Sequence, residues 1–211
     1  MEFDKIADTI LNTLSLLISK EPYRIAEIEM YLMTPKHPDT FCVKTKPLLL
    51  NECIHFRSFL GGGYDKGFHK GCDLTFGNQA DKTYFGVLIR SIVNPKTDEF
   101  IEGPDEVVRE MLNKCKKKNL LVLVKDGKNW GFSSGNGLIE VRTDNELEKK
   151  NVFKGPRVGL KGENKEFVSR NYRYTTEYKR TSFRPSLTRL REASIPRPML
   201  SIWPGLRRLL T

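Results

Sequence analysis

The stretch "YRIAEIEMYL", residues 23–32, is the part of the sequence that predicts the fold most directly. Side chains of a β-strand point alternately to the two faces of a sheet. Read in that period, one face is mostly apolar and carries Arg24, Ala26, Ile28, Met30 and Leu32. The other face carries Tyr23, Ile25, Glu27, Glu29 and Tyr31. We therefore predict a strand over residues 23–33 with two carboxylates on the same face.

Two carboxylates at positions i and i+2 of a strand have a chemical consequence. Glu27 and Glu29 repel each other, so at least one pKa should rise unless water or a cation screens them. A carboxylate in that state can take a proton from water, which is the task of a general base in hydrolysis. Tyr31, on the same face, would suit a flat substrate. A second interpretation stays open, in which this face is wet and Arg or Lys neighbours pair the acids.

Further elements are predicted on both sides of this strand. Apolar residues at helical spacing predict a helix over 4–19, and the Gly-Pro start and lysine-rich end of 102–118 predict another. Further strands are predicted from the apolar runs at 39–49, 53–60, 72–77, 84–93, 120–127 and 137–143. The segments 157–163 and 172–178 close the domain. This order of elements predicts one α+β domain, rich in β-structure and curved or barrel-like, over residues 1–178.

The segment 179–211 differs in composition from the rest of the chain. The whole chain has a net charge of +10, and after residue 178 eight basic residues face one acid, Glu192. The segment is also rich in proline, so we expect a basic Arg/Pro-rich tail outside the domain. Such a tail can bind the phosphates of a nucleic acid. It can equally be a solvated tail with no specific ligand.

Composition also excludes some classes of protein. No apolar run approaches the roughly 20 residues that a membrane-spanning helix needs, and the first residues are not a secretory signal. The four cysteines, Cys42, Cys53, Cys72 and Cys115, include no closely spaced pair. A zinc site with the nearby histidines is conceivable, but free thiols in a reducing compartment fit the spacing better. We therefore expect an intracellular protein with no membrane contact and no metal.

Five short motifs, taken in order over residues 23–176, resemble one known family. They are "RIAEIEMYL", "GVLIRSI", "EGPDEVVREML", "RVGL" and "YRYTT". Together they resemble the alkyladenine (3-methyladenine, methylpurine) DNA glycosylase family, of which this chain would be a divergent member. The resemblance implies an α+β fold with a curved antiparallel sheet and a few packed helices. It also implies a monomer that needs no cofactor and acts on double-stranded DNA with a modified base.

The resemblance also implies roles for single residues. Glu29 matches the general base that activates water for attack at the sugar C1′, and Tyr31 matches an aromatic that stacks on the flipped base. His37 matches a pocket histidine that hydrogen-bonds near the base or the 5′ phosphate. Arg90 matches an active-site arginine. A flipped base needs a π surface, and phosphates need a cation, so these residue types suit base excision.

The chain departs from the family between residues 61 and 73. There the family has a tyrosine-rich hairpin, whereas this chain has "GGGYDKGFHKG". Tyr64 is the candidate for a second stacking ring. The candidates for contact with DNA are Phe68 or His69 as the wedge, together with Lys70, Arg180 and Arg184. The glycines and lysines around Tyr64 can also form a solvated loop.

Asp73 stands where the family has a pocket asparagine. An ionised aspartate only accepts hydrogen bonds, whereas asparagine also donates them. If Asp73 faces the flipped base, that base should carry donors, and a base other than alkylated adenine is expected. In the competing interpretation, Asp73 is structural: it caps the turn before it or pairs with Lys70 or Arg90.

Three functions follow from these residues. The first is a DNA glycosylase-like hydrolase, and the second is a non-catalytic nucleic-acid-binding protein of the same fold. The third is hydrolysis of a free nucleoside, which would need neither a wedge nor a basic groove. The first predicts that Glu29, Tyr31, His37 and Arg90 converge on one pocket.

Overall fold

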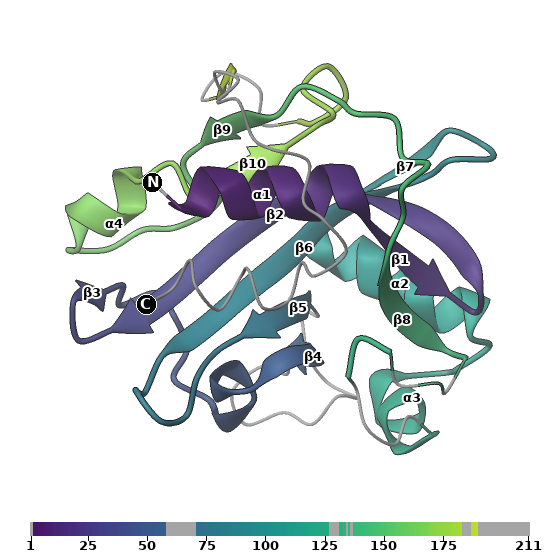
Figure 1. Ribbon diagram of the computed structural model, residues 1–211, viewed down its shortest axis with the longest axis horizontal. Helices are drawn as coiled ribbons and strands as arrows, with labels where there is room; N and C mark the ends of the chain where they lie inside the picture. Colours follow the sequence, from purple (N-terminus) through teal and green to yellow (C-terminus); the bar gives the residue numbers. More distant parts are fainter. Residues whose placement is uncertain are drawn as a thin grey trace.

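A computed structural model describes residues 2–57, 71–126, 131–133, 135, 137–182 and 187–189. In these residues the chain forms an α+β fold with an 11-stranded antiparallel sheet and four α-helices, and the predicted fold class is therefore confirmed. The two longest strands, β2 (Glu21–Thr34) and β6 (Tyr84–Asn94), lie side by side across the middle of the sheet (Figure 1).

The other strands extend the sheet on both sides of this pair. The main path runs β11-β9-β10-β2-β6-β5-β4. Its outer members are β4 (Asn51–Arg57), β5 (Gly71–Phe76), β9 (Phe153–Gly155), β10 (Arg173–Thr175) and β11 (Thr188–Arg189). Off this path lie β1 (Leu14–Ile18), β3 (His37–Pro38), β7 (Glu99–Glu102) and β8 (Ile139–Thr143). β1 pairs with both β2 and β8, while β3 pairs with β2 and β7 pairs with β6.

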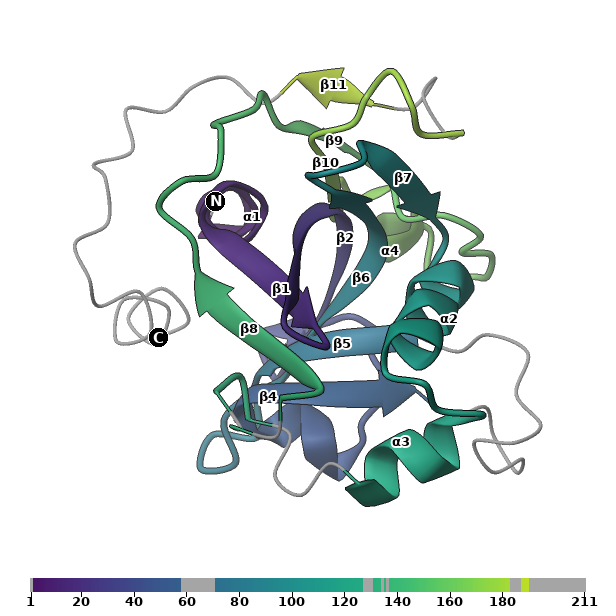
Figure 2. The ribbon, with the colours of Figure 1, turned by 90° about the vertical axis from the view of Figure 1, so that its right-hand side faces the viewer.

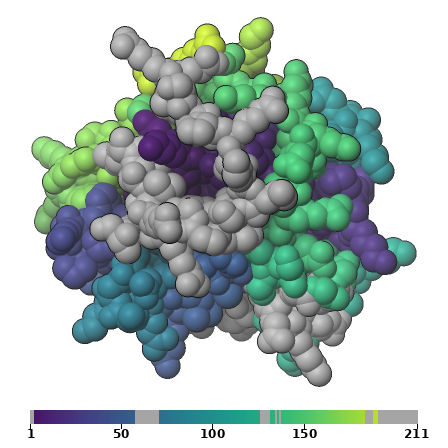
Figure 3. All heavy atoms as spheres, viewed as in Figure 1, coloured from purple at the N-terminus to yellow at the C-terminus, as the bar shows by residue number. Residues whose placement is uncertain are grey.

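The helices enclose one main hydrophobic core. They are α1 (Glu2–Thr13), α2 (Pro104–Lys114), α3 (Leu120–Asp126) and α4 (Lys165–Ser169). α1 and α2 stand on either side of the central strands in the turned view (Figure 2). Apolar side chains of both helices join those of β1, β2, β5, β6 and β8 in this core. Beside α1 (purple), the space-filling view shows green residues of the β8–β9 connection (Figure 3), where the Asn12 side chain donates to the Lys150 carbonyl.

The predicted helix over 4–19 is wrong in its second half. Residues Leu14–Ile18 form β1, because every one of them is buried and their backbone pairs with both β2 and β8. A strand buried on both faces needs no polar alternation, so its sequence looks like the continuation of an amphipathic helix. Ser19 and Lys20, with φ of 51° and 70°, make the tight turn from β1 into β2.

Two predicted strands are also absent from the described residues. Residues 39–49 form turns and the 3-10 helix Lys46–Leu49, and the Asp39 side chain accepts a hydrogen bond from the Phe41 amide at the start of this segment. Residues 120–126 form α3, because the Asn119 side chain accepts from the Val122 amide and caps the helix.

The alternation predicted along β2 breaks at a β-bulge. The register against β6 shifts between Ile25 and Glu27 and again between Glu27 and Ile28. As a result, Tyr23 and Ile25 join Ile28 and Met30 in the main core instead of sharing a face with the carboxylates. A bulge inserts one extra residue and re-aims the side chains beyond it. Glu27, Glu29 and Tyr31 keep the common face that the sequence predicted.

Candidate functional site

A layer of acids and arginines covers the sheet face that points away from the main core. Strand pairing builds it: Glu29 lies opposite Leu88 of β6, which lies opposite Asp73 of β5, and Arg173 of β10 lies opposite Glu29 on the other side. We call it the polar layer. Its charged members are Glu27, Glu29, Asp39, Arg57, Asp73, Arg90, Arg157 and Arg173, and two of the arginines, Arg57 and Arg157, lie over the ring of Tyr31.

Glu29 is held by three donors at the centre of this layer. Its side chain is 1% exposed. One oxygen accepts from the Tyr31 hydroxyl at 2.7 Å. The other accepts from the Val158 amide at 2.7 Å and lies 3.3 Å from Nη1 of Arg90. These contacts fix the carboxylate in one orientation, which is what a general base requires.

Glu27 faces a different set of partners. Its carboxylate accepts from Nε of Arg90 at 3.0 Å and from the Thr181 hydroxyl at 3.1 Å, and it lies 3.5 Å from Nη1 of Arg173. Burial raises the pKa of Glu27, while the charges of Arg90 and Arg173 act in the opposite direction. The pKa of Glu27 is therefore raised, as predicted for at least one of these carboxylates. The largest cause of this rise is burial rather than repulsion by the neighbouring acid.

Arg90 bridges the two carboxylates with the fork of its guanidinium. Nε contacts Glu27 and Nη1 contacts Glu29, and the side chain is 11% exposed. The interpretation that the carboxylate face is wet is wrong, because both acids are 1% exposed. The same interpretation also predicted that Arg or Lys neighbours pair the acids, and buried arginines do so. A buried charge is tolerated only when it is paired in this way.

Two guanidinium groups lie over the ring of Tyr31. Cζ of Arg57 stands 4.7 Å from the ring centroid, and Cζ of Arg157 stands 4.5 Å from it. Both distances fall within the range of cation–π attraction. Burial and the charge of Glu29 raise the pKa of the Tyr31 hydroxyl, so it stays a donor to Glu29. In this state of the protein, arginines rather than a base stack on Tyr31.

Asp73 is bound by Arg57 through two parallel hydrogen bonds. Nε and Nη2 of Arg57 both lie 2.7 Å from the carboxylate oxygens, and the Asp73 side chain is 1% exposed. The structural interpretation of Asp73 named Lys70 or Arg90 as its partner; the partner observed is Arg57. Gly86 leaves room here, because a Cβ on it would lie 2.6 Å from Cδ2 of Leu48 and 3.5 Å from Cγ of Asp73.

His37 lies in the hairpin from β2 into β3, among aromatic rings. Among the described residues, its ring packs against Phe3, Phe167 and Tyr172, with centroid distances of 5.9, 5.1 and 5.6 Å. Phe3 and Tyr172 belong to the main core. Burial lowers the pKa of His37. Glu29 is therefore in direct contact with Tyr31 and Arg90, whereas the ring contacts described for His37 are with aromatic residues. Convergence of the four residues on one pocket stays a prediction.

Four members of the polar layer were not predicted from the sequence: Asp39, Arg57, Arg157 and Arg173. Arg157 is 0% exposed, forms hydrogen bonds to Asp39 at 2.6 and 3.1 Å, and donates to the carbonyls of Met30 and Phe167. It is the first residue of the "RVGL" motif. That motif contributed to the family resemblance, but no role was predicted for the Arg157 side chain. Alternation along β4 puts Arg57 on one face with His55, a signal that could have pointed to it.

Of the remaining predicted residues, the structure describes Arg180 alone. Tyr64, Phe68, His69, Lys70 and Arg184 lie outside the described residues. Arg180 pairs with Asp98 at 2.8 Å and stacks over the ring of Phe100. It also lines a groove of about 610 Å³ together with Lys149, Lys150, Lys179 and three acids. Beside it, Thr181 is fully buried against Glu27 and Glu102.

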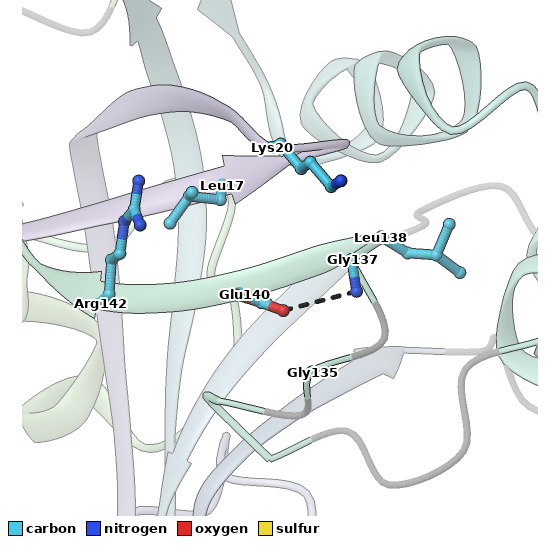
Figure 4. A pocket seen from close by; sticks show the side chains of 7 residues that line it. All are labelled: Leu17, Lys20, Gly135, Gly137, Leu138, Glu140 and Arg142. Carbon is cyan, nitrogen blue, oxygen red and sulfur yellow. Dashed lines mark hydrogen bonds between the residues drawn. The ribbon is translucent and has the colours of Figure 1, made fainter.

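A second hollow lies over the paired strands β1 and β8. It has a volume of about 340 Å³ and is lined by Leu17, Lys20, Gly135, Gly137, Leu138, Glu140 and Arg142 (Figure 4). Figure 4 shows Glu140 turned back to accept a hydrogen bond from the Gly137 amide. None of the predicted site residues lines this hollow.

The described residues contain no group of three or more His, Cys, Asp or Glu side chains that could hold a metal ion. The four cysteines are free thiols. None of the helices described has the length and apolar character that crossing a bilayer requires.

Comparison with known proteins gives one finding on ancestry. No family model matches the chain. An uncharacterized protein, L759, of Acanthamoeba polyphaga mimivirus is 30% identical to it over 183 residues. The match covers 82% of this chain and 84% of the viral protein.

Proposed function

We propose that this chain, which belongs to the same family as the mimivirus protein L759, is a DNA glycosylase-like hydrolase. It flips a modified base out of double-stranded DNA into the polar layer and cleaves the N-glycosidic bond of that nucleotide. The observation that carries the proposal is the convergence of Glu29, Tyr31 and Arg90. This group combines a fixed carboxylate, an aromatic ring and a cation on one sheet face, which are the parts that base excision needs.

In the proposed reaction, Glu29 takes a proton from water while the water oxygen bonds to the sugar C1′. The C1′–N bond breaks, and its electron pair leaves with the base, which then takes up a proton. Arg90 and the Val158 amide hold the carboxylate in place for this transfer. Loss of a general base usually slows such a step by about 10²–10⁴-fold.

The balance of charge in the polar layer supports the same reaction. Its four acids, Glu27, Glu29, Asp39 and Asp73, face four arginines, Arg57, Arg90, Arg157 and Arg173. Positive charge develops on the sugar as a glycosidic bond breaks. If a substrate displaces one arginine, the layer becomes net negative where that charge forms, and fixed charges of opposite sign stabilise the transition state.

The proposed partner is double-stranded DNA, and the proposed acting form is a monomer in the compartment that holds this DNA. The groove is lined by four cations, Lys149, Lys150, Lys179 and Arg180, and by three acids, of which Glu177 pairs with Lys150 and Asp98 pairs with Arg180. We propose that these cations and the basic residues of the segment 179–211 contact phosphates. Contacts of this kind supply affinity without reading sequence.

A second candidate is a non-catalytic nucleic-acid-binding protein of the same fold. One observation favours it: the three donors described for Glu29 come from the protein itself, and two arginines lie over the ring of Tyr31. A purely structural ion-pair network would have this form. In that case the polar layer would hold the sheet together and never meet a base.

Excision separates the two candidates. The wild-type protein is incubated in excess with duplexes that each carry one modified base, and released base and abasic sites are measured. The hydrolase predicts abasic sites on at least one duplex. DNA binding with no abasic site on any duplex of a panel of alkylated, oxidised and deaminated bases would favour the non-catalytic protein.

A further inference from the structure

We propose that Arg57 occupies the place of the substrate base, and that the base is of the guanine type: a purine with a hydrogen on N1 and an amino group on C2. This inference rests on the proposed function and specifies its substrate. It starts from what Arg57 does in the polar layer. A flat group lies over the ring of Tyr31 and directs two parallel N–H donors to one buried carboxylate.

The two arginines on Tyr31 are held very differently. The Arg157 side chain is 0% exposed and binds Asp39 and two carbonyls, so it is part of the scaffold. The Arg57 side chain is 27% exposed, and the hydrogen bonds described for it go to Asp73. A flat ligand that stacks on Tyr31 can therefore replace Arg57, but not Arg157.

Any group that replaces Arg57 must satisfy Asp73. This carboxylate is 1% exposed, and a buried charge left without a partner is strongly unfavourable. The incoming group must present two adjacent donors, because an ionised carboxylate accepts hydrogen bonds and cannot donate them. The spacing is that of the guanidinium fork, which matches the two oxygens of a carboxylate.

Among the bases, the Watson–Crick edge of guanine has this arrangement. Its N1–H and 2-amino group point the same way, as the N–H groups of Arg57 do. Adenine offers one amino donor beside an acceptor nitrogen, and neutral cytosine does the same. Hypoxanthine keeps N1–H but has no amino group at C2. A site built on hydrogen bonds to such groups rejects an analogue that lacks one of them.

The test measures binding rather than excision. Two fluorescent duplexes differ in one base, guanine or hypoxanthine, placed opposite an abasic site so that flipping breaks no base pair. The nucleotide carries a 2′-fluoro-arabino sugar, which resists cleavage, and dissociation constants are measured by anisotropy. We expect the wild type to bind the guanine duplex about tenfold or more tightly, since a hydrogen bond to a charged group contributes on that order.

Variants assign this preference to Asp73. Asp73→Asn should remove it, because asparagine presents one donor and one acceptor in place of two acceptors. Arg109→Ala serves as the matched control, because Arg109 is an exposed arginine of α2 that pairs only with acids of its own helix. It should leave the preference for guanine unchanged. Arg57→Ala should keep the preference for guanine, because it removes the group that the base displaces.

Equal dissociation constants for the two duplexes with wild-type protein would overturn the inference, whether or not Asp73→Asn folds. A preference that survives Asp73→Asn or is lost in Arg57→Ala would also overturn it. The proposed function is tested separately. A preference for guanine without excision of any base would support the binding site and contradict the hydrolase activity. Excision without this preference would support the hydrolase activity and contradict the binding site.

Discussion

Replacing Arg157 by methionine tests how the polar layer is anchored. Arg157 joins three segments that are distant in the sequence: it contacts Asp39 after β3, the Met30 carbonyl in β2 and the Phe167 carbonyl in α4. It also supports one face of the Tyr31 ring. Methionine fills most of the same space but donates no hydrogen bond. The variant therefore leaves the Asp39 carboxylate, which is 0% exposed, without its cation.

The size of the effect follows from this burial. Removing one partner of a buried ion pair lowers the free energy of unfolding by about 3–5 kcal/mol. For a domain of this size, each kcal/mol shifts the melting temperature by roughly 2–4 °C, so we expect a decrease of roughly 6–20 °C. Arg109→Met is the control. Its ion pairs are about half exposed, and such pairs contribute about 1 kcal/mol or less.

The assay is urea and thermal unfolding of four proteins: wild type, Arg157→Met, Asp39→Asn and the double variant. Because the double variant leaves no buried charge unpaired, it should recover part of the loss, giving a favourable coupling energy between the two positions. A loss of less than about 1 kcal/mol in Arg157→Met would refute the reasoning. So would single losses that simply add in the double variant.

Three further predictions concern other parts of the fold. Burial lowers the pKa of His37 below its ordinary 6.5, so the unfolded chain takes up a proton first and the free energy of unfolding falls as pH drops below 6.5. The variant His37→Phe should show a smaller decrease of the urea midpoint between a pH above 6.5 and a pH below it, and a decrease equal to that of the wild type would contradict this prediction. Gly77→Ala would place a Cβ 1.9 Å from the Leu48 carbonyl oxygen and should destabilise by at least about 1–3 kcal/mol in the same assay, whereas Gly131→Ala, with nothing nearer than 3.8 Å, should not. A chain ending at 189 should melt like the full chain, whereas one ending at 178 loses the Thr181 hydroxyl that contacts Glu27 and Glu102 and should lose about 1–3 kcal/mol; equal melting temperatures of the two would argue against that anchor.

The elements that could be predicted are those whose pattern and partners agree. β2 and β6 alternate or run apolar over many residues, and α2 has Pro104 at its start and lysines at its end. The runs at Leu14–Ile18 and Leu120–Asp126 are short and apolar, and periodicity alone does not separate helix from strand there. β1 is a strand because it pairs with both β2 and β8, a contact that no local pattern reveals.

The candidate site divides in the same way. Glu29 and Tyr31 could be predicted together because side chains two positions apart in a strand lie on the same face of the sheet. The pair Arg57–Asp73 depends on the register between β4 and β5, and the pair Arg157–Asp39 joins residues 118 positions apart. Neither distance is readable from one sequence. The bulge after Ile25 also decides which neighbours share the face of Glu29.

The most direct test of the proposed hydrolase is single-turnover excision by Glu29→Gln on the best duplex from the excision panel. Glutamine keeps the shape of Glu29 and can accept from the Val158 amide, but it is a far weaker proton acceptor. Glu106→Gln, an exposed change on α2, is the control. We expect Glu29→Gln to slow excision by about 10²–10⁴-fold while DNA binding and the control rate stay near wild type. A rate within about threefold of wild type would contradict the assignment of Glu29 as the general base.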